Sequence, residues 1–121
     1  MTHTRARGDA WEARAATWLE ARGWEIVDRN FNAPGGELDL VARQGELLAF
    51  VEVRGRADAR AGHPAETISA TKRRRVVTAA RHWLARYGDQ GCDLRFDVLT
   101  LVGPPEAAEV CHFEGAFEAE A

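Results

Sequence analysis

Hydrophobic residues recur with a helical period in two stretches of this chain. In residues 8–22 they fall three or four positions apart, and Gly23 follows as a predicted stop. The second stretch begins after Ser69, a residue suited to the N-cap position, and runs to about Tyr87. Each stretch predicts an amphipathic helix with one face turned to a core. The first stripe contains Trp11, Ala15, Trp18 and Leu19, and the second contains Val76, Val77, Ala80, Trp83, Leu84 and Tyr87.

A period of two, or a short apolar run, predicts strands elsewhere in the chain. Residues 30–35 contain Asn, Pro and Gly and are predicted to form a loop, and residues 43–46 are predicted to be the turn of a hairpin. Residues 55–64 lack any period, so we expect a longer loop there. The predicted strands are residues 24–28, 37–42, 47–54 and 94–102, with a short edge strand at 109–113.

The order of these elements predicts the fold class. The order αβββαβ is expected to give an α/β protein in which helices flank a mixed sheet. At 121 residues the chain is expected to hold one domain. We place this domain at residues 1–103, because Gly103 and the two prolines after it end the last long strand. Residues 104–121 are expected to form an acidic C-terminal tail, with or without the edge strand.

Composition narrows the class of protein. No apolar run approaches the ~20 residues that span a bilayer, so no membrane association is expected. The N-terminal residues lack the apolar centre of a secretory signal. Cys92 and Cys111 have no metal-ligand spacing around them, and we expect reduced thiols of a cytoplasmic protein.

Charge is divided unevenly along the chain. All 16 basic residues lie at or before Arg95, whereas six of the 19 acidic residues follow it, the last five of them after residue 103. Residues 72–86 are strongly basic and begin with the run Lys72, Arg73, Arg74 and Arg75. A polyanion such as nucleic acid would be attracted to this face. A basic helix face that is only solvated is an equal alternative.

Four charged residues interrupt the apolar pattern of the predicted hairpin. Because side chains two apart on a strand share a face, Glu37 lies beside Asp39, and Glu52 lies beside Arg54. Buried charges are costly unless they are paired or bind a metal. If the turn centres near residues 44–45, Asp39 lies opposite or diagonal to Glu52. Both carboxylates can then ligate one hard cation such as Mg²⁺.

Two further side chains are expected at the same place. Glu12 lies at the edge of the first apolar stripe and can complete the site from the helix. Lys72 lies one turn before Val76, near a helix N-terminus that favours anions. A cation can hold a phosphate and lower the pKa of water, and Arg54 can neutralise developing charge. The alternative is a solvated hairpin held by cross-strand salt bridges.

These residues, taken in order, resemble a known family. Over about residues 7–102 the chain resembles the YraN-type UPF0102 family of small bacterial proteins, which is similar to Holliday-junction resolvase-like and restriction-endonuclease-like PD-(D/E)xK nucleases. The motifs are Glu12, Arg29-Asn30, Gly36-Glu37-Leu38-Asp39-Leu40, Phe50-Val51-Glu52-Val53-Arg54-Gly55-Arg56, Lys72-Arg73-Arg74-Arg75 and Arg95-Phe96-Asp97-Val98.

The resemblance implies a restriction-endonuclease-like fold and a metal-dependent endonuclease that acts on or binds DNA, branched DNA included. It implies that Asp39 and Glu52 ligate Mg²⁺ or Mn²⁺ and that Glu12 is the acid from the helix. The catalytic set is then Glu12, Asp39, Glu52, Arg54 and Lys72, and the nucleic-acid contacts are Arg56, Lys72, Arg73, Arg74 and Arg75.

One position departs from the nuclease signature, which has a lysine where this chain has Arg54. Arginine stays charged and cannot act as a base. Because Lys72 is the one lysine among sixteen basic residues, it can supply that role, or the metal alone can activate water. Otherwise the protein binds structured nucleic acid without cutting it. A third hypothesis is a protein-interaction domain, with a homodimer as one form.

Overall fold

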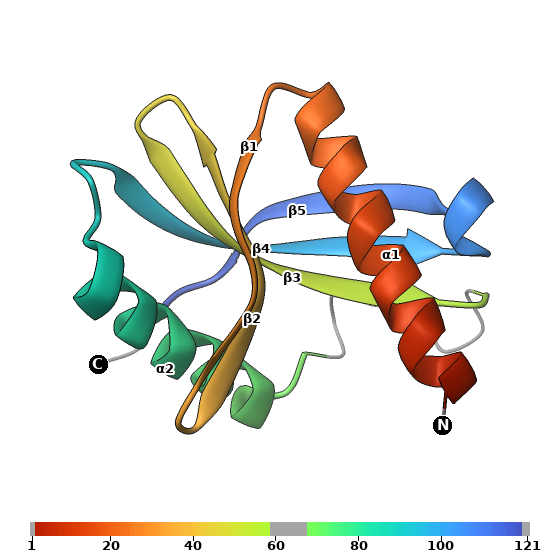
Figure 1. The fold of residues 1–121 in the computed structure, drawn as a ribbon, viewed down its shortest axis with the longest axis horizontal. Helices are drawn as coiled ribbons and strands as arrows, with labels where there is room; N and C mark the ends of the chain where they lie inside the picture. The colour runs from red at the N-terminus through yellow and green to blue at the C-terminus, as the bar shows by residue number, and fades with distance from the viewer. Residues whose placement is uncertain (1, 59–67, 120–121) are drawn as a thin grey trace.

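The computed structural model of this chain describes residues 2–58 and 68–119. The order of the elements confirms the predicted αβββαβ class, and the expected edge strand is present as a fifth strand (Figure 1). The elements are α1 (Thr2–Ala21), β1 (Glu25–Ala33), β2 (Gly36–Gln44), β3 (Leu47–Arg56), α2 (Ala70–Tyr87), β4 (Asp93–Val102), the 3₁₀ turn η2 (Pro105–Ala107) and β5 (Glu109–Phe117).

The five strands form one mixed sheet in the order of the sequence, β1-β2-β3-β4-β5. β3 and β4 are parallel, whereas the other three neighbouring pairs are antiparallel. A parallel pair needs a long crossover connection, and α2 lies within it. This architecture is consistent with the expected restriction-endonuclease-like fold.

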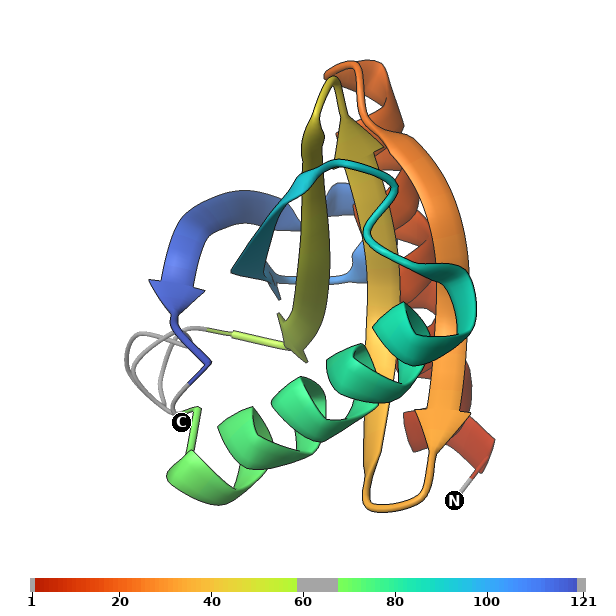
Figure 2. The same ribbon diagram turned by 90° about the vertical axis from the view of Figure 1, so that its left-hand side faces the viewer.

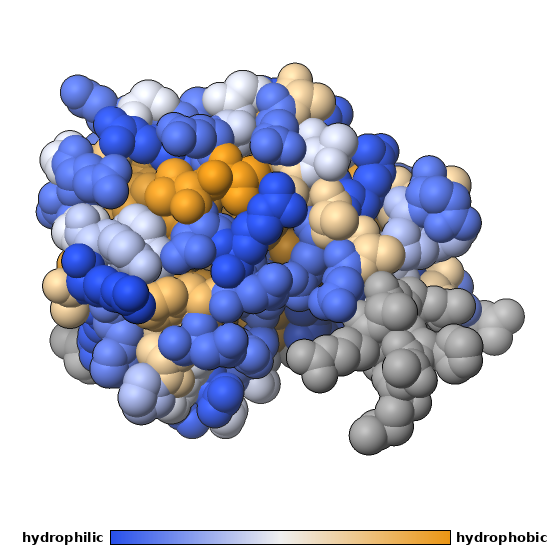
Figure 3. Space-filling model, viewed as in Figure 1, coloured by the Kyte–Doolittle hydropathy of each residue, from blue (hydrophilic) through white to orange (hydrophobic). Residues whose placement is uncertain are grey.

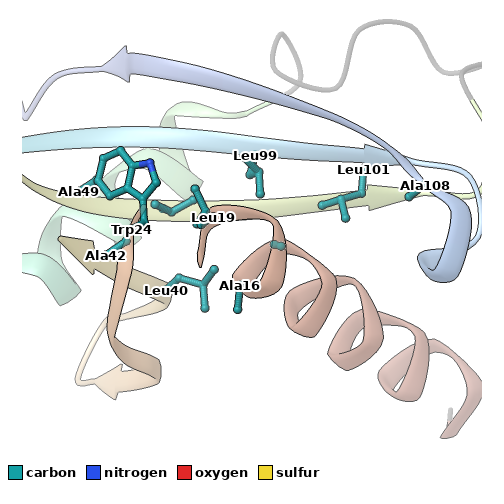
Figure 4. Packing of buried hydrophobic residues seen from close by; sticks show 11 residues of the cluster. Ala16, Leu19, Trp24, Leu40, Ala42, Ala49, Leu99, Leu101 and Ala108 are labelled. Atoms are coloured by element: carbon teal, nitrogen blue, oxygen red, sulfur yellow. The ribbon is translucent and has the colours of Figure 1, made fainter. Parts of the chain in front are cut away.

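The two helices cover opposite faces of the sheet, and β3 shows why its sequence is apolar without interruption. Leu48 and Phe50 pack with α2, whereas Ala49 and Val51 pack with α1. A strand that is buried on both faces reads as a continuous apolar run. Figure 2 shows α2 in front of the sheet and α1 behind β1 and β2. Figure 4 shows the α1 side, where Leu19 lies among side chains of β2, β3 and β4.

Two predicted loops differ from the structure. β1 continues to Ala33, which pairs with Gly36, so the predicted loop at 30–35 is reduced to Pro34 and Gly35. Direct pairing with β2 outweighs the turn-forming composition of this segment. β3 continues to Arg56, so the second predicted loop begins later than expected. Part of that loop, from residue 59 onward, lies outside the described residues.

A buried carboxylate fastens β5 to β4. Asp97 is fully buried and accepts hydrogen bonds from Arg95 Nε at 2.8 Å and from the backbone N of Gly115 at 3.0 Å. His112 Nε2 lies 2.7 Å from its other oxygen. Burial raises the pKa of Asp97, but these partners outweigh burial and lower the pKa to about 2. β5 is therefore longer than the predicted edge strand at 109–113, and much of the acidic tail belongs to the sheet.

The face in Figure 3 is mostly hydrophilic, and hydrophobic residues gather on it between the two helices. No helix in the described ranges is long and apolar enough to cross a membrane. Cys92 and Cys111 are both free, as expected for reduced thiols.

Candidate active site

Asp39 lies where β2 separates from β3. The ladder between the two strands begins only at Leu40, which pairs with Val51. Beyond that point Asp39 Oδ2 accepts a hydrogen bond of 2.8 Å from the backbone N of Val53. The carboxyl group therefore takes the place of the missing strand partner. This bond fixes Asp39 against β3 beside Glu52, as the hairpin spacing predicted.

Glu52 is an acidic residue inside the core, with 2% of its surface exposed. Its Oε1 lies 2.8 Å from Nζ of Lys72. Its other oxygen, Oε2, is buried and has no hydrogen-bond partner in the described part of the chain. An unsatisfied buried oxygen costs free energy, so this atom is a place where a proton or a cation would be stabilising.

The neighbouring carboxyl groups of Asp39 and Glu52 oppose each other's ionisation. Burial and the nearby charge of Asp39 raise the pKa of Glu52 to about 8, although the bond to Lys72 acts in the opposite direction. Burial also raises the pKa of Asp39, despite its bond to Val53. Near neutral pH the pair therefore retains a proton between its carboxyl groups. A divalent cation would relieve the same repulsion, because it stabilises both ionised forms.

The placement of Lys72 follows from a close approach of α2 to the sheet. A Cβ atom on Gly36 would lie 2.0 Å from the carbonyl oxygen of Arg75, so only glycine allows this contact. Lys72 is nearly one turn earlier on α2, and its Nζ also lies 3.6 Å from Glu37 Oε1. Burial lowers the pKa of Lys72, but Glu52 and the other carboxylates outweigh burial and raise it. Lys72 is thus a charged group in contact with the pair.

Glu12 faces the same region from α1. The ring of Trp11 packs so closely on Gly55 that a Cβ there would lie 2.1 Å from it, and this contact sets α1 against β3. Burial, followed by the charge of Asp39, raises the pKa of Glu12 to about 7. A side-chain hydrogen bond with Asn30 opposes this rise.

Asn30 is a site residue that the sequence analysis did not assign. It has a positive φ of 51° within β1. Its neighbours pair with Leu40 and Leu38, so Asn30 stands opposite Asp39. Asparagine tolerates this backbone region better than most residues, and that tolerance was the available signal. The turn-like composition of residues 30–35 pointed instead to a loop.

The predicted arginines are divided between two places. Arg54 lies on the Glu52 side of β3 by strand alternation, is partly exposed, and pairs in the ladder with Thr100. Arg56 is also partly exposed at the end of β3. Arg73 and Arg74 do not join the carboxylates, and instead line a separate hollow of about 350 Å³ on the outer side of α2. The side chain of Arg75 is exposed.

A family model covers most of this chain. The model described as "Uncharacterised protein family UPF0102" matches residues 11–101. This chain belongs to the UPF0102 family. UPF0102 relatives include a protein of Chromohalobacter salexigens, 47% identical over 96% of this chain and 94% of the relative. Another, from Myxococcus xanthus, is 46% identical over 95% and 91%. The UPF0102 protein YraN of Escherichia coli is 42% identical over 83% and 78%.

The donor set of this UPF0102 protein limits how it could hold a metal. Among the side chains that the structure describes, in residues 9–58 and 68–119, no three Asp, Glu, His or Cys residues converge into a metal-binding group. A cation at Asp39 and Glu52 would therefore complete its shell with backbone oxygen and water, as Mg²⁺ commonly does. The free Oε2 of Glu52 and the raised pKa values of the pair fit such an ion.

Proposed function

We propose that this protein is a metal-dependent endonuclease that hydrolyses phosphodiester bonds in DNA, branched DNA included. The observation that carries the proposal is the buried Glu52 beside the partly buried Asp39, with Lys72 in contact and one Glu52 oxygen that receives no bond from a donor group of the described residues. A purely structural salt bridge between Glu52 and Lys72 would not need a second carboxyl group whose charge raises the pKa of Glu52. Carboxylates beside a fixed cation are instead the groups that phosphoryl chemistry uses.

Mg²⁺ or Mn²⁺ is the proposed cofactor, with Asp39 and Glu52 as its protein ligands. When bound, such an ion lowers the pKa of water and stabilises charge on a phosphate. The raised pKa of Glu52, about 8, means that ion binding competes with a proton. Occupancy of the site should therefore increase with pH.

The chain's own residues supply the remaining roles. Lys72 stays charged, because its carboxylate partners raise its pKa, so it holds and neutralises a phosphate oxygen rather than accepting a proton. Arg54 is likewise a permanent charge. Glu12, with a pKa raised to about 7, is the group on α1 that can exchange a proton near neutral pH. Lys72 thus supplies the positive charge of the lysine that the nuclease signature has at position 54, but it does not act as a base.

A cleavage assay tests this proposal. Linear duplex, single-stranded and four-way-junction DNA are incubated with Mg²⁺ or Mn²⁺ and the wild type, Asp39→Asn, Glu52→Gln or Lys72→Met. We expect cleavage by the wild type and losses of about 100-fold or more in the variants. Glu46→Gln, which removes an exposed carboxylate in the hairpin turn, serves as the matched control and should cleave normally. Absence of cleavage of every substrate with both metals contradicts the proposal.

A second candidate function is nucleic-acid binding without cleavage. Arg54 favours it, because an arginine at that position cannot act as a base. The comparison of wild type with Arg54→Lys separates the two. Cleavage that appears only in Arg54→Lys would indicate a lapsed enzyme with an intact metal site. Salt-sensitive DNA binding that survives Glu52→Ala, without cleavage in either protein, would favour the binding module.

A further inference from the structure

The α2 face of the sheet is only partly covered. α2 packs against β1, β2 and β3, and leaves β4 and β5 open on this side. Leu94 at the start of β4 is 44% exposed. Phe96 and Phe117 are partly buried and stack on one another, with ring centroids 5.1 Å apart. An apolar surface therefore remains beside the basic helix.

Two adjoining hollows form one groove along this side of α2. The first, of about 350 Å³, is lined by Arg73, Arg74 and Arg81. The second, of about 610 Å³, has an apolar floor that includes Phe96 and Phe117. Val77, Arg81 and Glu118 line both hollows, so the two lie side by side. We call this the α2 groove.

The arginines of the α2 groove have donors to spare. Arg73 Nη1 donates to the carbonyl oxygen of Ile68, and Arg74 Nη2 donates to Thr71 Oγ1, so most of their N–H groups make no bond to another described residue. No ion pair within the described residues involves these two arginines or Arg81. Glu118 is the one acidic residue that lines the groove in the described part of the chain.

We propose that the α2 groove binds an unpaired nucleic-acid strand. Phosphates would lie on Arg73, Arg74 and Arg81, and bases would lie against Phe96 and Phe117. This inference rests on the proposed function and specifies its substrate as DNA with a single-stranded segment. The groove starts beside the N-terminal turn of α2, where Lys72 enters the candidate active site.

The chemistry of the groove favours an unpaired strand over a duplex or an acidic peptide. Single-stranded nucleic acid combines an anionic charge on every nucleotide with an apolar base face, and proteins bind it with cations beside aromatic rings. A duplex hides its base faces, so it would leave the apolar floor empty. An acidic peptide matches the arginines, but it presents flat apolar groups only in particular sequences.

Binding measured without metal tests the inference separately from cleavage. Fluorescence anisotropy in EDTA and low salt compares a labelled oligothymidylate of about 20 nucleotides with a blunt duplex of the same length. We expect the wild type to bind the single strand about 10-fold more tightly than the duplex. Arg81→Ala should weaken single-strand binding by about 5-fold. Arg86→Ala, an exposed arginine of α2 that does not line the groove, should change it less than about 2-fold.

The apolar floor is tested with Phe117→Ala, which should weaken single-strand binding by about 5-fold or more through lost stacking. Circular dichroism checks its fold, and the Arg81→Ala comparison decides the question if this variant unfolds. Equal affinity for duplex, equal effects of the two arginine variants, or equally strong competition by polyglutamate overturns the inference. So does a homodimer, seen by light scattering, that Leu94→Lys dissociates.

The outcomes separate this inference from the proposed enzyme. Single-strand binding through Arg81 and Phe117 without any cleavage supports the groove and refutes the nuclease. Cleavage with no preference for unpaired strands supports the nuclease and refutes the groove.

Discussion

Replacing Glu52 by glutamine is expected to stabilise the metal-free protein at alkaline pH. Glu52 is almost fully buried, and burial together with Asp39 raises its pKa from the ordinary 4.5 to about 8. The folded protein therefore holds a proton that the unfolded chain releases between these pH values. The stability that this proton contributes is fully present below about pH 4.5 and is lost as the pH rises through about 8.

The size of the effect follows from the same two values. Each pKa unit corresponds to about 1.4 kcal/mol, so the full rise from 4.5 to about 8 corresponds to at most ~5 kcal/mol of unfolding free energy. A domain is stable by only about 5–15 kcal/mol, so this loss should be easy to measure. Glutamine carries no charge, and Glu52→Gln should therefore lose much less stability on the same pH change. Glu12 and Asp39 act in the same direction and leave a residual slope.

Urea unfolding followed by tryptophan fluorescence in EDTA provides the measurement, at pH values from about 5 to 9. Glu46→Gln removes an exposed carboxylate and is the matched control. We expect the control to follow the wild type, and Glu52→Gln to become the more stable protein above about pH 8. Equal stability of the wild type at both ends of the range would refute the reasoning, as would parallel curves for wild type and Glu52→Gln.

Two further substitutions test the supports of the fold and the site. Asp97→Asn should reduce the free energy of unfolding by about 3–5 kcal/mol at pH 7, because Arg95 and His112 lose a buried partner. Since the pKa of Asp97 is lowered from 3.8 to about 2, the wild type should lose about 2.5 kcal/mol of its stability as the pH falls from about 4 toward 2. The exposed Asp93→Asn is its control in urea unfolding, and equal effects of the two would exclude the network. Gly36→Ala should cost about 2–3 kcal/mol in thermal unfolding and reduce cleavage, because the new Cβ would lie 2.0 Å from the carbonyl oxygen of Arg75 and displace Lys72. Unchanged stability would show that α2 adjusts without strain.

The sequence predicted those parts of the molecule that depend on local patterns. Ser69 caps α2 as expected, and its Oγ accepts a hydrogen bond of 3.1 Å from the backbone N of Lys72. The helical stripe placed Lys72 toward the sheet, and strand alternation placed Asp39 near Glu52. Both inferences need only the period of the element and a short turn.

The remaining features arise from contacts between distant segments. The ladder between β2 and β3 ends at Leu40, which leaves Asp39 without a strand partner in β3, and no local sequence pattern marks that end. Asn30 meets Glu12 across two elements, and His112 meets Asp97 across 15 positions. A lone asparagine or histidine has no period, so its partner becomes visible only when the strands are assembled.

The proposed reaction requires a divalent metal centre at Asp39 and Glu52, and titration calorimetry with Mn²⁺ tests that requirement most directly. At pH 7 we expect binding of about one ion per chain with release of about one proton, because the carboxyl pair gives up its shared proton to the metal. Proton release is measured by repeating the titration in buffers of different ionisation enthalpy. Asp39→Asn and Glu52→Gln should lose this binding, and Glu46→Gln should retain it. Absence of Mn²⁺ binding by the wild type, or binding that both carboxylate variants retain, would contradict the metal centre.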